Sequence, residues 1–220
     1  MGTNPMWWVV VPLKDTHRAK SRLGGDPGER RRLAIAMARD TLDAVRQASL
    51  VAGVVVVCDT DADVEVFTMS GTSVVVSDRS GLNGSIGFGA DVVRSRSASR
   101  HLAVLPGDLP YLRASELDMA LGRAAGVESG CVADRPGTGT TLLTSRAGVP
   151  LRPAYGGGSL QAHRAGGAVE LGVPAWSGLR RDVDFRDDVT NDAAMNAHTR
   201  AMVQGSPWEW WGSRSNGGAA

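Results

Sequence analysis

Short apolar runs alternate with longer amphipathic segments along the first half of the chain. The runs at 7–12, 54–58, 73–77 and 102–106 are rich in β-branched residues and show no regular polar alternation. Such runs indicate strands that are covered on both faces, as in a parallel sheet. The segment 29–50 between the first two runs places apolar residues at helical spacing, with arginines elsewhere on the circumference, and this predicts an amphipathic helix.

The alternation of strand and helix continues to about residue 125 and becomes less regular afterwards. This order predicts a doubly wound α/β fold, with helices on both faces of a mostly parallel central sheet. We expect a single domain at 1–204, because no repeat or linker interrupts it, and a disordered tail at 205–220. The other predicted elements are helices at 61–69, 85–96, 115–125, 160–165 and 192–203 and strands at 131–134, 140–144 and 182–185.

Composition limits the classes of partner. The formal net charge is only +1, so no overall field favours nucleic acid or an anionic membrane. No stretch approaches the roughly 20 apolar residues of a membrane-spanning helix, and no signal peptide precedes the first strand. Cys58 and Cys131 lie far apart in apolar runs without a CxxC motif, which favours buried thiols in a reducing cytoplasm.

Basic side chains gather directly after the first predicted strand, where four of them lie within residues 14–22, the basic loop. Ligands of open α/β sheets bind at the carboxyl ends of strands, and Lys and Arg there neutralise phosphate. The basic loop has neither the GxxxxGK[ST] nor the GxGxxG pattern, so side chains would do most of the phosphate binding. A solvated basic loop is the alternative interpretation.

Acidic residues follow two other predicted strands. Asp108 comes after the strand at 102–106 in Gly107-Asp108-Leu109-Pro110, where a carboxylate can ligate Mg²⁺ that bridges nucleotide phosphates. Asp182 and Asp184 alternate on the predicted strand 182–185 and would share one side of it. Like charges so close repel unless a cation neutralises them. A turn aspartate and an acidic edge paired with nearby arginines are the alternatives.

Two glycine-rich turns, at 137–141 and 155–159, carry hydroxyl groups. Ser159 precedes a predicted helix whose free N–H groups would attract the phosphate or carboxylate of an acceptor, and His163 lies one turn further on. Asn83, after the third strand, offers a donor and an acceptor for a base edge or ribose. Ordinary hairpin and capping chemistry, a packed histidine and a turn asparagine are the alternatives.

The sequence lacks G-x-S-x-G, HExxH and Cys–His signatures, so it offers no recognisable protein nucleophile. Phosphoryl-type transfer needs none, because it depends mainly on positioning, a metal ion and positive charge. A site made of aspartate, lysine, arginine and glycine loops is therefore chemically sufficient for it.

In these segments the chain resembles the guanylyltransferases that make the activated lactyl or enolpyruvyl donor for the deazaflavin coenzyme F-420. The pair Ala19-Lys20-Ser21-Arg22-Leu23 and Pro106-Gly107-Asp108-Leu109-Pro110 is fairly specific, and the LAGGxSxRMG opening of molybdopterin guanylyltransferases is absent. The other matching segments are 11–14, 81–83, 134–141, 156–159 with His163, and 182–184, so that the resemblance spans about 7–203.

The resemblance implies a Rossmann-like nucleotide-diphospho-sugar-transferase fold. It also implies transfer of GMP from GTP to phosphoenolpyruvate with release of pyrophosphate; 2-phospho-L-lactate and 3-phosphoglycerate are close alternatives as acceptors. The implied site residues are Asp108, Asp182 and Asp184 for Mg²⁺, Lys14, Lys20, Arg22 and Asn83 for GTP, and Thr141, Gly156, Ser159 and His163 for the acceptor, with Lys20, Arg22 and Asp108 as the catalytic group.

Two functions of other classes stay open. A glycosyltransferase of the same fold would need an aspartate at position 110 for its usual DxD pair, and Pro110 stands there. A non-catalytic nucleotide-binding module would have little use for three carboxylates beside several cations. The sequence gives no indication of the oligomeric state.

Overall fold

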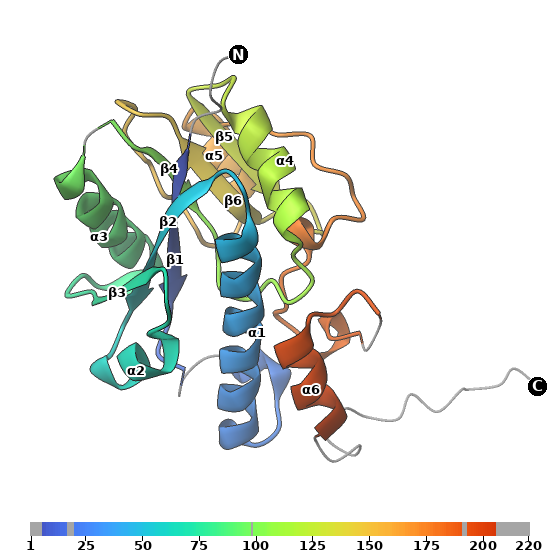
Figure 1. Cartoon of the computed structure of the whole chain (residues 1–220). Coiled ribbons are helices and arrows are strands. Elements are labelled where there is room, and N and C mark those ends of the chain that lie inside the picture. Colours follow the sequence, from blue (N-terminus) through green and yellow to red (C-terminus); the bar gives the residue numbers. More distant parts are fainter. Residues whose placement is uncertain (1–5, 17–19, 98, 191–192, 206–220) are drawn as a thin grey trace, which may run out of the picture.

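The computed structural model describes residues 6–16, 20–97, 99–190 and 193–205 (Figure 1). Its centre is a seven-stranded sheet in the order β3-β2-β1-β4-β6-β5-β7. β6 pairs antiparallel with β4 and β5, whereas β1–β2, β1–β4, β2–β3 and β5–β7 are parallel pairs. The prediction of a mostly parallel sheet is confirmed. The strands are β1 (Trp7–Leu13), β2 (Val51–Cys58), β3 (Thr72–Val76), β4 (His101–Val104), β5 (Ser129–Ala133), β6 (Thr140–Ser145) and β7 (Val169–Glu170).

Helices cover both faces of this sheet. In β1, Val9 and Val11 join the same apolar cluster as Leu42 of α1 (Pro27–Gln47), and α4 (Ala114–Ala124) packs on that side as well. Val10, between them, faces the other way and packs with Ile86 of α3 (Gly81–Arg96). Successive side chains of a strand point to opposite faces, so an unbroken valine run is the pattern of a strand buried on both. α5 (Ser159–Ala165) lies on the α3 face.

A third apolar cluster ties the C-terminal segment to the first helix. Leu33 and Met37 of α1 pack with Val203 of α6 (Ala197–Gly205) and with Val183. Figure 1 shows α6 beside α1, so the two segments lie together although they are far apart in sequence. Val183 is fully buried, and its burial holds the neighbouring acidic residues beside the segment that follows β4.

The structure differs from the sequence prediction in the second half. The segment 182–185 forms no strand; Val183 N donates a single backbone hydrogen bond to Asp108 O at 3.1 Å. Without a ladder, nothing imposes strand alternation on Asp182 and Asp184. The predicted helix at 61–69 is a 3₁₀ turn (Asp61–Asp63) followed by the single-turn α2 (Val64–Phe67).

Two other boundaries also shift. α3 begins four residues before the prediction, and α6 begins only at Ala197. The short strand β7 was not predicted. Residues 206–220 of the predicted tail, Arg18 of the basic loop and Ala19 of the resemblance lie outside the described residues. In the described ranges, no helix is both long and apolar enough to span a membrane.

Candidate active site at the carboxyl ends of the strands

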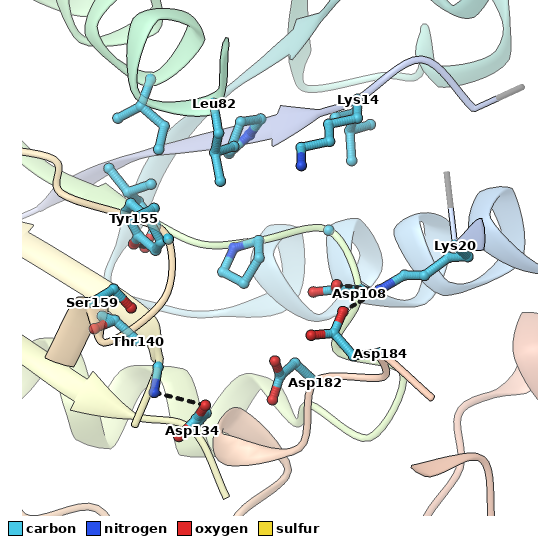
Figure 2. A pocket seen from close by; sticks show the side chains of 18 of the residues that line it. Lys14, Lys20, Leu82, Asp108, Asp134, Thr140, Tyr155, Ser159, Asp182 and Asp184 are labelled. Atoms are coloured by element: carbon cyan, nitrogen blue, oxygen red, sulfur yellow. Dashed lines mark hydrogen bonds and ion pairs between the residues drawn. The ribbon is translucent and has the colours of Figure 1, made fainter. Parts of the chain in front are cut away.

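A cleft of about 700 Å³ opens beyond the carboxyl ends of β1 and β4 (Figure 2). That volume suits a small-molecule substrate site. The cleft brings together the basic loop, the segment after β4, the β5–β6 hairpin and the turn before α5, which lie far apart in sequence. Its polar lining includes Lys14, Thr16, Lys20, Arg22, Asp108, Asp134, Thr138, Thr140, Tyr155, Ser159, Asp182 and Asp184.

Lys20 points at carboxylates. Its Nζ lies 2.5 Å from Asp108 Oδ2 and 3.3 Å from Asp184 Oδ1, and it also donates to the carbonyl oxygen of Val183 (Figure 2). Burial by itself lowers the pKa of Lys20, but Asp108 and Asp184 raise that pKa above its ordinary value, so the ammonium stays charged. The resemblance implied that Lys20 faces the phosphates of GTP; in this structure it neutralises two aspartates instead.

Asp108, Asp182 and Asp184 form a carboxylate cluster on one side of the cleft. Burial, and then the charges of Asp108, Asp184 and Asp134, raise the pKa of Asp182 to about 7. Asp108 Oδ1 is buried and has no hydrogen-bond partner among the residues that the structure describes. Several carboxylate oxygens thus lie close together with too little positive charge to neutralise them. Such a group of oxygens suits a hard divalent cation such as Mg²⁺.

The present arrangement of the carboxylate cluster is nevertheless not a metal cage. Among the described residues, no three acidic, histidine or cysteine side chains are arranged to hold a metal ion. The Lys20 ammonium contacts two of the three aspartates and takes the place that a cation would need between them. The structure therefore brings the three predicted ligands together, and the charge of Lys20 already neutralises part of their negative charge.

Two further cations line the cleft. Lys14 is exposed at the end of β1 and reaches into the cleft across from the carboxylate cluster (Figure 2). The Arg22 guanidinium lies over the ring of Phe185, 5.7 Å from its centroid. Lys14 thus places positive charge across the cleft from the carboxylate cluster, an arrangement that suits an anionic ligand carried with a metal ion.

The glycine loop, residues 155–158, forms another wall of the cleft together with Ser159. Gly156 and Gly158 have φ of +144° and +71°, backbone conformations that favour glycine. The free N–H groups expected at the start of α5 are partly used, because Ser159 N donates to Gly156 O at 3.2 Å and Leu160 N to Thr138 O at 3.1 Å. Gly156 and Ser159 lie where the sequence predicts them, but the helix start is not an open anion site.

Asn83 does not line the cleft as a base-binding residue would. Its Nδ2 donates to Tyr155 O at 3.0 Å, and its Oδ1 accepts from Tyr155 N at 2.8 Å. Both polar atoms of the Asn83 amide therefore bond to the backbone of Tyr155. In this structure Asn83 therefore connects the glycine loop to α3, and its contact with the nucleotide stays a prediction.

His163 also has a structural position: it does not line the cleft, and both of its ring nitrogens bond to neighbouring segments. It is 2% exposed, and its Nε2 accepts from Ala154 N at 2.9 Å. The proton must then be on Nδ1, which donates to Thr140 Oγ1 at 2.9 Å. Burial lowers the pKa of His163, which keeps the ring neutral. With both nitrogens engaged, His163 joins the segment before the glycine loop to the β5–β6 hairpin, and its contact with the acceptor stays a prediction.

Thr141 is displaced from the cleft by a β-bulge. Ala133 pairs with Thr140 whereas Val132 pairs with Leu142, so Thr141 is the extra residue on β6. It is 1% exposed and does not line the cleft, whereas Thr140 does. The bulge changes which side chain faces the site, so Thr140 stands where the sequence predicts Thr141, and a role of Thr141 in acceptor binding stays a prediction.

Sequence reasoning missed the residue that anchors the basic loop. Asp63 is fully buried; its Oδ1 accepts from Thr16 Oγ1 at 2.6 Å and its Oδ2 from Thr16 N at 3.1 Å. Arg31 Nη2 lies 3.8 Å from Asp63 Oδ1, and Arg31 Nε donates to Thr16 Oγ1 at 3.0 Å. Thr16 and Asp63 are 47 residues apart, and no local pattern links them.

Asp134 is the other missed residue. Its two carboxylate oxygens accept from Thr138 N and Gly139 N, each at 2.8 Å, and so shape the β5–β6 hairpin. The sequence contains a usable signal here, because an aspartate before a glycine-rich turn often accepts from the backbone of that turn.

Comparison with known proteins identifies the family. Residues 7–172 match the family described as "Guanylyl transferase CofC like". A phosphoenolpyruvate guanylyltransferase of Streptomyces scabiei is 43% identical over 83% of this chain and 88% of its own length. One of Geodermatophilus obscurus is 41% identical over 91% of this chain and 95% of its own.

Solved structures agree in fold. A protein of Desulfovibrio desulfuricans G20 assigned to the nucleotide-diphospho-sugar transferases matches with a TM-score of 0.69 at 14% identity, over 91% of this chain and 94% of its own. Rv0371c of Mycobacterium tuberculosis H37Rv matches with a TM-score of 0.57 at 21% identity, over 85% of this chain and 96% of its own. The predicted fold and family are both confirmed, and the chain belongs to the CofC-like guanylyltransferase family.

Proposed function

We propose that this protein transfers GMP from GTP to phosphoenolpyruvate and releases pyrophosphate. A phosphate oxygen of the acceptor attacks the α-phosphorus of GTP; the new P–O bond forms as the bond from the α-phosphorus to the bridging oxygen breaks, and pyrophosphate leaves with that oxygen. The names of the relatives support phosphoenolpyruvate as the acceptor. 2-Phospho-L-lactate and 3-phosphoglycerate remain the competing acceptors.

The observation that carries this proposal is the cleft that gathers Lys14, Lys20 and Arg22 around the carboxylate cluster. Both reactants are polyanions, so bringing them together costs Coulomb energy that the site must offset. Lys14 and Arg22 line the cleft, and in this proposal both bind phosphate oxygens of GTP. Their role is to hold GTP in line with the acceptor, since phosphoryl-type transfer depends chiefly on position and charge.

Mg²⁺ is the cofactor of the proposed reaction. Asp108, Asp182 and Asp184 would hold it, and when bound it supplies positive charge at the phosphates. The unpartnered Asp108 Oδ1 and the raised pKa of Asp182 support a cation at this point. Lys20 and Arg22 complete the catalytic group that we assign to this chain.

The acceptor occupies the wall formed by the glycine loop in this proposal. Gly156 and Ser159 line it, and Gly156, Gly157 and Gly158 carry no side chain that would occupy the space beside them. Asn83 and His163 hold that wall in place from behind. We assign the reaction to the cytoplasmic synthesis of the deazaflavin coenzyme F-420, and to one domain at 1–204.

Pyrophosphate release tests the proposed reaction. Purified protein is incubated with GTP, Mg²⁺ and each of the three acids in turn, with ATP as the matched nucleotide control. We expect the largest kcat/KM with GTP and phosphoenolpyruvate. Absence of pyrophosphate with all three acids would reject the proposed reaction, and preference for another acid would reject the acceptor.

The variant Asp108→Asn tests the role of the carboxylate cluster. We expect a loss in kcat on the order of 100-fold or more, as for removal of other preorganised charged groups at transition states. Asp91→Asn is the control, because Asp91 is an exposed aspartate of α3 that pairs with Arg79 and does not line the cleft. Near-normal turnover of the Asp108→Asn protein would contradict the assignment.

A further inference from the structure

The Lys20 ammonium has no hydrogen-bonding capacity to spare in this structure. An ammonium group carries three N–H donors. Its partners here are Asp108 Oδ2, Asp184 Oδ1 and the carbonyl oxygen of Val183, which use all three. Lys20 cannot bind a phosphate oxygen unless it first gives up at least one of these partners.

The backbone of Lys20 is unusual as well. Its φ is +58°, and it is the one described non-glycine residue with positive φ. That region is unfavourable for a residue with a β-carbon, and such residues cluster where the surrounding contacts are functional. The contacts with the two aspartates offset this cost, so their loss would release the residue towards another conformation.

The same contacts prevent the carboxylate cluster from holding a metal ion. Asp108 Oδ2, one of the two oxygens of the best-placed ligand, already accepts from Lys20 at 2.5 Å. A divalent cation between Asp108 and Asp184 would have to displace an ammonium that is attracted to both. Two cations cannot share that space, since their repulsion in a partly buried site is several kcal/mol.

We propose that Lys20 is the internal counter-ion of the carboxylate cluster and competes with the divalent cation for it. The metal ion then enters only with a nucleotide, whose phosphates draw the ammonium out of the cluster. This exchange gives Lys20 two positions, on the carboxylates before binding and on the phosphates after it, and it makes metal binding weak in the absence of nucleotide. Only the statement that the metal ion enters with a nucleotide rests on the proposed function; the competition between Lys20 and the metal ion does not.

A purely structural ion pair is the competing explanation. It makes a different prediction, because removing a structural lysine lowers stability and leaves the affinity for a metal ion unchanged. Removing a competitor raises that affinity. The loss of any positive charge also favours a cation slightly, so a control must remove a charge from the same cleft without touching the carboxylates.

The experiment titrates Mn²⁺, as the probe, into protein without nucleotide and measures bound ion by electron paramagnetic resonance. The variants are Lys20→Met, Lys20→Arg and, as the matched control, Lys14→Met. Lys14 lines the same cleft and forms no ion pair with any residue that the structure describes. We expect Lys20→Met to bind Mn²⁺ at least about tenfold more tightly than the wild type, and the Lys20→Arg and Lys14→Met proteins to stay within about threefold.

Equal or weaker Mn²⁺ binding by Lys20→Met would overturn the inference, and so would an equal gain in Lys14→Met. If Lys20→Met is unfolded without metal, circular dichroism during the same titration decides: folding induced by Mn²⁺ supports competition, and no folding overturns it. The titration contains no GTP and no acid, so it is independent of whether the wild type releases pyrophosphate.

Discussion

The bond between Thr16 and Asp63 provides the sharpest test of how the basic loop is held. The change Thr16→Val keeps the shape of the side chain and the backbone N–H, but it removes the hydroxyl that donates to Asp63 Oδ1 at 2.6 Å. Asp63 is fully buried and Thr16 is 4% exposed, so the carboxylate depends on donors from the protein and not on bulk water. The carboxylate is left short of one donor in a low-dielectric site.

The expected loss in the free energy of unfolding follows from the charge of the Asp63 carboxylate, which accepts the hydrogen bond. A hydrogen bond to a charged group contributes about 1.5–3 kcal/mol, and an unsatisfied buried partner sets the cost near the upper end of that range. For a chain of 220 residues, each kcal/mol lowers the Tm by about 2–4 °C, so we expect a decrease of about 5–10 °C. Thr16→Ser keeps the hydroxyl, loses one methyl group and should cost no more than about 1 kcal/mol.

The assay combines urea unfolding with steady-state kinetics of both variants. Because Thr16 precedes Lys20 and follows Lys14 in the basic loop, loosening it should raise the KM for GTP more than the KM for the acid. The Ser variant should restore both the free energy of unfolding and the KM for GTP. If the Val and Ser variants differ by less than about 0.5 kcal/mol, the anchoring argument is wrong.

The remaining predictions concern buried groups. Burial lowers the pKa of His163 below its ordinary value of 6.5. Below pH 6.5 the unfolded state therefore binds a proton at His163 that the folded state does not bind. The stability that the neutral His163 contributes is present above that pH and is lost as the pH falls. Urea unfolding should therefore show a difference between wild type and His163→Phe that narrows on acidification; a constant difference between about pH 7.5 and 5 would refute this. Burial raises the pKa of Cys58 to about 12 and that of Cys131 to about 11, with nearby acidic charges adding to both shifts. The native protein should give no rapid reaction with a thiol-specific disulfide reagent near pH 8 and full reaction in guanidinium chloride, and fast labelling of the folded protein would count against their burial.

The regular part of the fold could be predicted from the chain alone. Valine runs without polar alternation predict strands buried on both faces, and β1 and β2 have that environment because each valine meets a helix layer on its own side. The spacing of apolar residues predicts α1 for the same local reason. The basic loop and Asp108 also follow their strands directly, so chain order alone places them at the rim of the sheet.

Tertiary structure decided which side chains contact one another at the carboxyl ends of the strands. Lys20 meets Asp108 across 88 residues, and Asn83 meets the backbone of Tyr155 across 72. Loop conformations fix such pairs, and no periodicity records them. The same holds for the bulge that turns Thr140 instead of Thr141 towards the cleft. Burial patterns are local and repeat along the chain, so the sequence determines the layers of this protein; the partners of its charged groups depend on where separate loops converge, and only the folded chain decides that.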